Sequence, residues 1–214
     1  MGITRNGIMS PMSGKAGPVI GRVVDGVGII CGLPKKQSTP YTAPQINIRT
    51  RFGLITRLFS YFTDVVRIGF PTKKKMTSAM NEAVSYNIKH AITGVGPDYT
   101  VDYTKLMISQ GKLVKPSAVE ITAVAQAKIQ LNWFYDNTIT ENIGAMDELV
   151  ALAYNQEDEE YMPVLRPVKR NAGTFTIRVP RSFVGKDVHV YLFFAGKAGR
   201  VSDSVYAGTI VPID

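Results

Sequence analysis

Apolar positions in the first part of the chain predict a β-hairpin. Two runs rich in β-branched residues, residues 19–24 and 27–31, are separated only by Asp25-Gly26. An Asp-Gly pair favours the positive φ angles of a two-residue type I′ turn, so the two runs are predicted to pair as antiparallel strands. The polar segment that follows them ends at Pro40. We expect this segment to be an extended connector.

Helical spacing replaces this pattern after the connector. Thr42 is suited to cap a helix, and Pro44 to stand in its first turn. One continuous apolar stripe predicts a helix that ends before Pro71, and its members follow one another at intervals of four and three: Ile48, Phe52, Ile55, Phe59, Phe62 and Val66. A second helix is predicted between a capping Ser78 and Gly94, with an apolar face made of Met80, Val84, Ile88 and Ala91.

Short strands separated by turn residues dominate the rest of the chain. Six β-rich runs are predicted, at residues 119–125, 129–135, 148–154, 174–179, 188–194 and 204–211. Roughly seven short strands in about a hundred residues are typical of a β-sandwich. The sequence therefore predicts an α+β protein. Residues 1–115 would form a basic region with a β-hairpin and two helices, and residues 116–214 a carboxy-terminal antiparallel β-sandwich.

The carboxy-terminal part resembles a fibronectin type III or bacterial immunoglobulin-like module. The resemblance rests on residues 119–122 as a first strand and on residues 129–133 as a second, which ends in a core tryptophan, Trp133. Residues 188–194 and 201–204 resemble the last hairpin of such modules, with Gly196 and Gly199 in its turn. This resemblance implies a sandwich fold and leaves the function open, because sandwiches serve many unrelated functions.

The whole chain is also similar to an uncharacterised family of small proteins found in Bacteroidota and their phages. The shared features are a Ser-Gly-Lys-x-Gly signature at residues 13–17, a valine-rich hairpin that leads into Pro34-Lys35-Lys36, and a following helix. Residues 85–88 and 188–208 fit the same pattern. The resemblance implies no particular enzymatic activity.

Charge is distributed unevenly along the chain. Residues 1–115 contain 16 Lys and Arg against 5 Asp and Glu, whereas residues 116–214 contain 9 against 12. Such asymmetry favours an anionic or acidic partner for the first part, or else basic residues that merely keep it soluble. The cationic candidates for such contacts are Lys35, Lys36, Arg49, Arg51, Arg57, Lys73, Lys74 and Lys75.

The residues that enzymes and metal sites require are scarce. The single cysteine, Cys31, excludes a disulfide within the chain, and with His90 and His189 as the two histidines no Cys/His zinc site is expected. The glycines at 26, 28 and 32 do not match a dinucleotide fingerprint, because they lie in a predicted hairpin. Asp187, His189 and Ser202 or Ser204 would form a triad only by accident. We therefore predict no catalytic residue, no cofactor and no metal.

Three functions remain open. The leading hypothesis is a non-enzymatic structural component of a phage or phage-like particle, which forms homo-oligomers or binds other structural proteins through the hairpin at Asp25-Gly26. The second is a cytoplasmic protein that contacts nucleic acid nonspecifically through its basic part. The third is a carbohydrate- or surface-binding module with a platform drawn from Tyr135, Tyr154, Tyr161 and Tyr206. We expect a virion or cytoplasmic location, without a secretory signal peptide or a membrane span.

Overall fold

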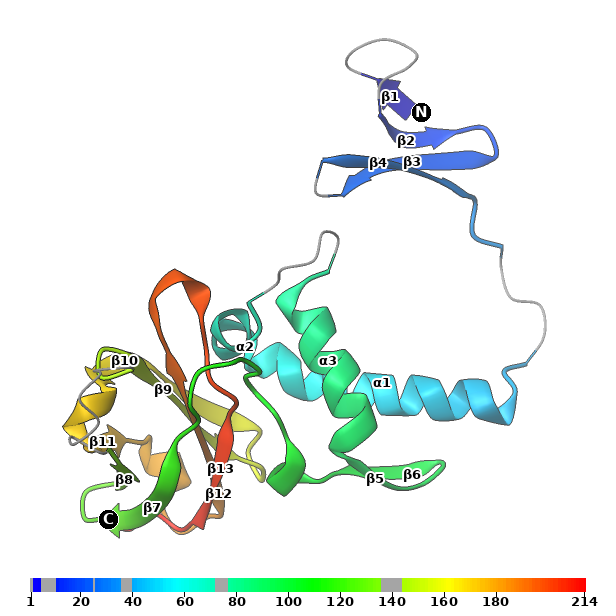
Figure 1. Ribbon diagram of the computed structural model, residues 1–214. Helices are drawn as coiled ribbons and strands as arrows, with labels where there is room; N and C mark the ends of the chain where they lie inside the picture. The colour runs from blue at the N-terminus through cyan, green and yellow to red at the C-terminus, as the bar shows by residue number, and fades with distance from the viewer. Residues whose placement is uncertain (1, 5–10, 25, 36–39, 72–76, 136–143) are drawn as a thin grey trace. The chain divides into compact units, whose positions relative to one another are not determined.

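The chain forms two separate compact units in a computed structural model that describes residues 2–4, 11–24, 26–35, 40–71, 77–135 and 144–214 (Figure 1). The first unit, here called the arm, comprises Met1–Gln45 and Lys73–Thr77. The second unit, here called the body, comprises Ile46–Thr72 and Ser78–Asp214. This division differs from the predicted boundary after residue 115, because the helices belong to the same unit as the sandwich.

The arm is a four-stranded antiparallel meander in the order β1-β2-β3-β4. Its strands are β1 (Gly2–Thr4), β2 (Met12–Ala16), β3 (Val19–Val24) and β4 (Val27–Gly32). The predicted hairpin is its second half, in which Val24 pairs with Val27 and Gly26 has the positive φ of 78° that the turn requires. Asp25, the other turn residue, lies outside the described residues.

Three α-helices belong wholly or mainly to the body: α1 (Ala43–Tyr61), α2 (Thr63–Gly69) and α3 (Ala79–His90). Sequence spacing predicts α1 and α2 as one helix, but the chain leaves the helical conformation at Phe62 and α2 takes a different direction (Figure 1). Phe62 is fully buried, so the break keeps its ring in the core while the backbone turns. The predicted cap of α3 is confirmed, since the Ser78 hydroxyl accepts a hydrogen bond from the Asn81 amide.

Two antiparallel sheets form the sandwich. One has the order β10-β9-β12-β13 and the other the order β11-β8-β7. Their strands are β7 (Ser117–Val124), β8 (Lys128–Phe134), β9 (Glu148–Asn155), β10 (Glu160–Lys169), β11 (Thr174–Arg178), β12 (Val188–Ala195) and β13 (Val205–Ile210). A separate hairpin joins β5 (Ile92–Val95) to β6 (Asp98–Val101). Short 3-10 turns η1 to η4 occupy Tyr103–Lys105, Arg170–Ala172, Arg181–Phe183 and Lys197–Gly199.

The central strands β9 and β12 of the four-stranded sheet in the sandwich are buried on both faces, so the body has three layers. One row of β9 and β12 side chains packs with β8 and β11 inside the sandwich: Leu149, Ala151, Ala153, Val188, Val190, Leu192 and Phe194. The alternate row packs against the helices: Val150, Leu152, Tyr154, Tyr191, Phe193 and Ala195. Because successive side chains of a strand point to opposite faces, these two strands join the helical layer to the sandwich.

Candidate interaction surfaces

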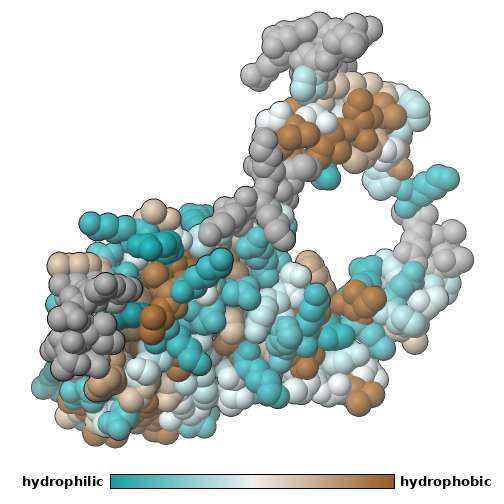
Figure 2. All heavy atoms as spheres, in the orientation of Figure 1, coloured by the Kyte–Doolittle hydropathy of each residue, from teal (hydrophilic) through white to brown (hydrophobic). Residues whose placement is uncertain are grey.

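The arm has almost no core of its own. Among the arm residues whose burial the structure describes, Gly21 alone is buried, because Met12 of β2 packs closely against it. Large apolar side chains instead face solvent: Ile30 is 69% exposed and Val23 50% exposed. Figure 2 shows apolar residues gathered over the visible face of this sheet. A sheet normally buries one face, whereas this sheet exposes large apolar side chains.

The register places Ile30 and Val23 on the same face of the arm. Ile30 pairs with Gly21, and Val23 pairs with Gly28, so each apolar side chain stands opposite a glycine. The outer edge of β4 adds unpaired backbone groups, since β4 is the last strand of this sheet. An apolar face beside a free strand edge suits association through side chains and backbone together.

A second exposed apolar stretch lies on the first turns of α1. Ile48 is 66% exposed and Phe52 is 52% exposed, whereas Ile55 and Phe59, later in the same predicted stripe, are fully buried. The spacing of these residues predicts one apolar face but does not reveal where the body ends. The first half of this stripe is therefore surface, and only the second half belongs to the core.

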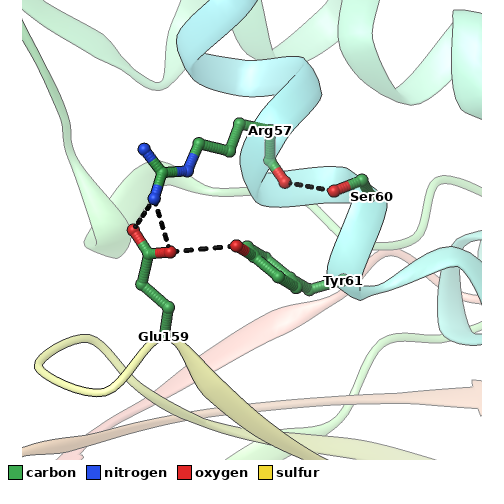
Figure 3. A network of polar contacts seen from close by, with 4 residues as sticks. All are labelled: Arg57, Ser60, Tyr61 and Glu159. Carbon is green, nitrogen blue, oxygen red and sulfur yellow. Dashed lines mark hydrogen bonds and ion pairs between the residues drawn. The ribbon is translucent and has the colours of Figure 1, made fainter.

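Two of the predicted cationic candidates, Arg51 and Arg57, form hydrogen bonds to other residues of the body. The Arg57 guanidinium donates hydrogen bonds to both carboxylate oxygens of Glu159, at 2.8 and 2.7 Å. The Tyr61 hydroxyl donates a hydrogen bond to the same carboxylate at 2.9 Å, and the Ser60 hydroxyl donates one to the Arg57 carbonyl (Figure 3). The hydrogen bond from Arg57 is the main reason why the pKa of Glu159 is lowered. Arg57 thus ties α1 to the turn between β9 and β10, although both partners are exposed to solvent.

Arg51 also makes contacts within the body. Its Nη2 donates to the Ile88 carbonyl at 2.6 Å, and its guanidinium lies 5.7 Å from the centre of the Tyr99 ring. These contacts hold α1 against the end of α3 and the β5–β6 hairpin, so Arg51 has a structural role that the charge pattern alone does not indicate.

The other cationic candidates are not brought together by the described structure. Lys35 is exposed at the end of the arm sheet, and Arg49 is exposed on α1. Four lysines, Lys36, Lys73, Lys74 and Lys75, lie outside the described residues. A continuous basic surface built from all the predicted residues therefore stays a prediction.

The residues that could have suggested catalysis have other partners. His189 Nδ1 lies 3.0 Å from the Tyr206 hydroxyl and 3.2 Å from that of Thr209. The Ser202 hydroxyl accepts from the Phe194 amide at 2.9 Å. Among the described residues, no three His, Cys, Asp or Glu side chains gather to hold a metal ion. The described helices include none that is long and apolar enough to cross a membrane.

The tyrosines proposed as a carbohydrate platform have different environments. Tyr154 is buried and meets Phe62 edge-to-face at 5.2 Å, so it is not part of an exposed platform. Tyr161 is 37% exposed but also packs against Phe62, at 6.0 Å. Tyr206 is half-buried beside His189, and Tyr135 is half-buried at the end of β8.

Comparisons with known proteins place the chain in a family. Two solved structures similar to it are fibronectin type III domains of human proteins. One, from the collagen alpha-1(XX) chain, has a TM-score of 0.34 and 12% identity, over 48% of this chain and 88% of that domain chain. The other, from contactin 1, has a TM-score of 0.30 and 10% identity, over 50% of this chain and 83% of that one. No curated protein matches the chain. The model of a family of unknown function, DUF6266, matches residues 11–208. Because that match spans nearly the whole sequence, the chain belongs to this family.

Proposed function

We propose that the protein is a non-enzymatic structural component of an assembly, which oligomerises through its arm and presents the β-sandwich. The observation that carries the proposal is the arm sheet, in which Gly21 is the single buried residue among those whose burial is described, while Ile30 is 69% exposed. Isolated small sheets are only marginally stable in water unless a hydrophobic face is covered. Association with a second copy would cover that face.

The nature of the assembly rests on the sequence resemblance. The Ser-Gly-Lys-x-Gly signature at residues 13–17 and the lysines after Pro34 are similar to proteins of Bacteroidota and their phages. We therefore propose a phage or phage-like particle as the setting. A cytoplasmic nucleic-acid-binding role has less support than assembly, because Arg51 and Arg57 are engaged within the body.

Native mass spectrometry and light scattering of the full-length protein, at low and high salt, test the proposal. We expect an oligomer that persists in high salt, because apolar contacts are not screened. Ile30→Asp should shift the protein to monomer, since a carboxylate in an apolar contact loses its hydration. Val95→Asp is the matched control: Val95 is 85% exposed on the β5–β6 hairpin of the body, so its replacement should leave the oligomer unchanged.

Two results would refute the assembly proposal. One is a monomer at every concentration that also binds no particle component. The other is an oligomer that Val95→Asp disrupts as strongly as Ile30→Asp. A monomer whose affinity for nucleic acid falls steeply with salt would instead support the nucleic-acid-binding role.

A further inference from the structure

The body contains a pocket of about 380 Å³ that shares no lining residue with the surfaces described above. Its lining comes from four segments that are distant in sequence: the stretch before β7, the turn before β9, η2, and η4 with the residue after it. The lining residues are Leu113, Val114, Gly144, Met146, Asp147, Arg170, Lys197 and Arg200.

A buried ion pair forms the inner wall of this pocket. Arg170 and Asp147 are each only 6% exposed, and Arg170 Nη1 lies 4.0 Å from Asp147 Oδ2. Each side chain keeps a buried polar atom without a hydrogen-bond partner in the described structure, Nε of Arg170 and Oδ2 of Asp147. Burial raises the pKa of Asp147.

The pair is held in place by the sandwich core. The Arg170 guanidinium lies 4.0 Å from the centre of the Phe194 ring, and Arg170 Nη2 donates to the Val114 carbonyl. The Trp133 indole donates to the Arg170 carbonyl at 2.7 Å. The Arg170 amide donates to the Asp147 carbonyl, also at 2.7 Å. These contacts fix the inner wall before any ligand arrives.

Two further cations line the pocket, Lys197 and Arg200. Lys197 and Arg200 are exposed, and within the described residues neither forms an ion pair. The turn that carries them is closed by a hydrogen bond of 2.8 Å from the Gly196 amide to the Arg200 carbonyl. With Arg170 offset by Asp147, the lining has an excess of two positive charges, those of Lys197 and Arg200.

We propose that this pocket binds a phosphate group, free or as a monoester. A phosphate monoester carries about −1.5 to −2 charges at neutral pH, which matches the excess positive charge of the lining. Arginine and lysine are the side chains that proteins use for such oxyanions. At roughly 30 Å³ for each water-sized group, the volume also holds a small organic group beside the phosphate. Leu113, Val114 and Met146 offer that group an apolar wall.

The fluorescence of the single tryptophan can report ligand binding in the pocket. Trp133 is hydrogen-bonded to the Arg170 backbone, so a ligand beside Arg170 should alter its fluorescence. Inorganic phosphate is titrated into the full-length protein at constant ionic strength, with sodium chloride as the reference salt. Calorimetry of the same titration detects binding that leaves the fluorescence unchanged. We expect a saturable response to phosphate and none to chloride.

Two double variants distinguish a specific phosphate site from nonspecific electrostatic attraction of anions. Lys197→Gln with Arg200→Gln should weaken phosphate binding at least tenfold without unfolding the protein, since both side chains are exposed. Arg178→Gln with Arg181→Gln removes the same charge from exposed positions elsewhere in the body and should leave binding unchanged. Equal loss in both double variants, or no saturable phosphate binding by either method, would overturn the proposal. Comparison of glucose 6-phosphate with a phosphoserine peptide then identifies whether a small metabolite or a modified protein supplies the group.

Discussion

Replacement of Phe59 by alanine tests whether the helices and the sandwich fold as one unit. Phe59 is fully buried on α1 and meets Phe62 edge-to-face at 6.0 Å, and Phe62 meets Tyr154 of β9 at 5.2 Å. Truncation of a buried phenylalanine costs about 3–5 kcal/mol, through lost transfer free energy and the cavity that remains. For a unit of this size that loss lowers the melting temperature by roughly 6–20 °C, at about 2–4 °C per kcal/mol.

The same helix supplies the control. Phe52 is 52% exposed, so Phe52→Ala makes the same chemical change with much less loss of packing. We expect it to reduce the free energy of unfolding by less than about 1 kcal/mol. Both changes act on helix propensity alike, so the difference between the two variants isolates burial.

Two spectroscopic signals follow the unfolding of the two variants. Far-ultraviolet circular dichroism reports on the helices, whereas fluorescence of Trp133 reports on the sandwich interior, on the far side of the four-stranded sheet. We expect Phe59→Ala to shift both transitions together and by the same amount. A shift of the helical signal that leaves the Trp133 transition in place would refute the three-layer reasoning and favour independent domains on either side of residue 115.

Three further outcomes are expected, for two glycine variants and for the pH dependence of stability. Gly53→Ala should stabilise the protein by about 0.5–1 kcal/mol, because a helical alanine is favoured over glycine and nothing lies within 4 Å of the added methyl group. Gly69→Ala should instead destabilise it, because the methyl group would lie 2.2 Å from the Ile108 carbonyl oxygen. Urea denaturation measures the change in the free energy of unfolding for each variant. Changes of the same sign in the two variants would contradict this reasoning. Burial lowers the pKa of His189 below 6.5, so the folded state binds the proton less tightly than the unfolded state. Stability should therefore be lost as the pH falls from 6.5 towards the folded-state pKa, and that slope should be weaker in His189→Gln when unfolding is followed across this range.

Local sequence patterns predict many elements of this fold, because those elements depend mainly on residues that are close together in the sequence. Gly26 marks the β3–β4 turn, and Ser78 caps α3 through a hydrogen bond to an amide three residues away. The six predicted strand runs correspond to β7, β8, β9, β11, β12 and β13. Sequence patterns do not predict β10, because Pro163 and Pro167 lie within it. An edge strand tolerates proline, and β10 is at the edge of its sheet.

Long-range partners explain what local patterns do not predict. The charge of Arg57 suggests an external anion, but its partner is Glu159, far away in the sequence. The wall of the proposed phosphate pocket combines Asp147 with Arg170 from different turns, and no spacing rule connects them. The predicted boundary after residue 115 differs from the structure for a similar reason. Residues 188–195 are apolar on both faces, which is typical of a strand with a layer on each side.

The double burial of β12 also limits how its sequence can drift over evolutionary time. Seven of its eight positions are buried, so nearly every polar replacement there removes a contact from one of two cores. On β7, at an edge of the outer sheet, residues alternate between exposed and half-buried along much of the strand. Mutations that survive selection should thus collect at the exposed positions of β7 and β11, while the central strands keep their apolar character. New binding properties would then arise at the periphery of a frame that changes slowly.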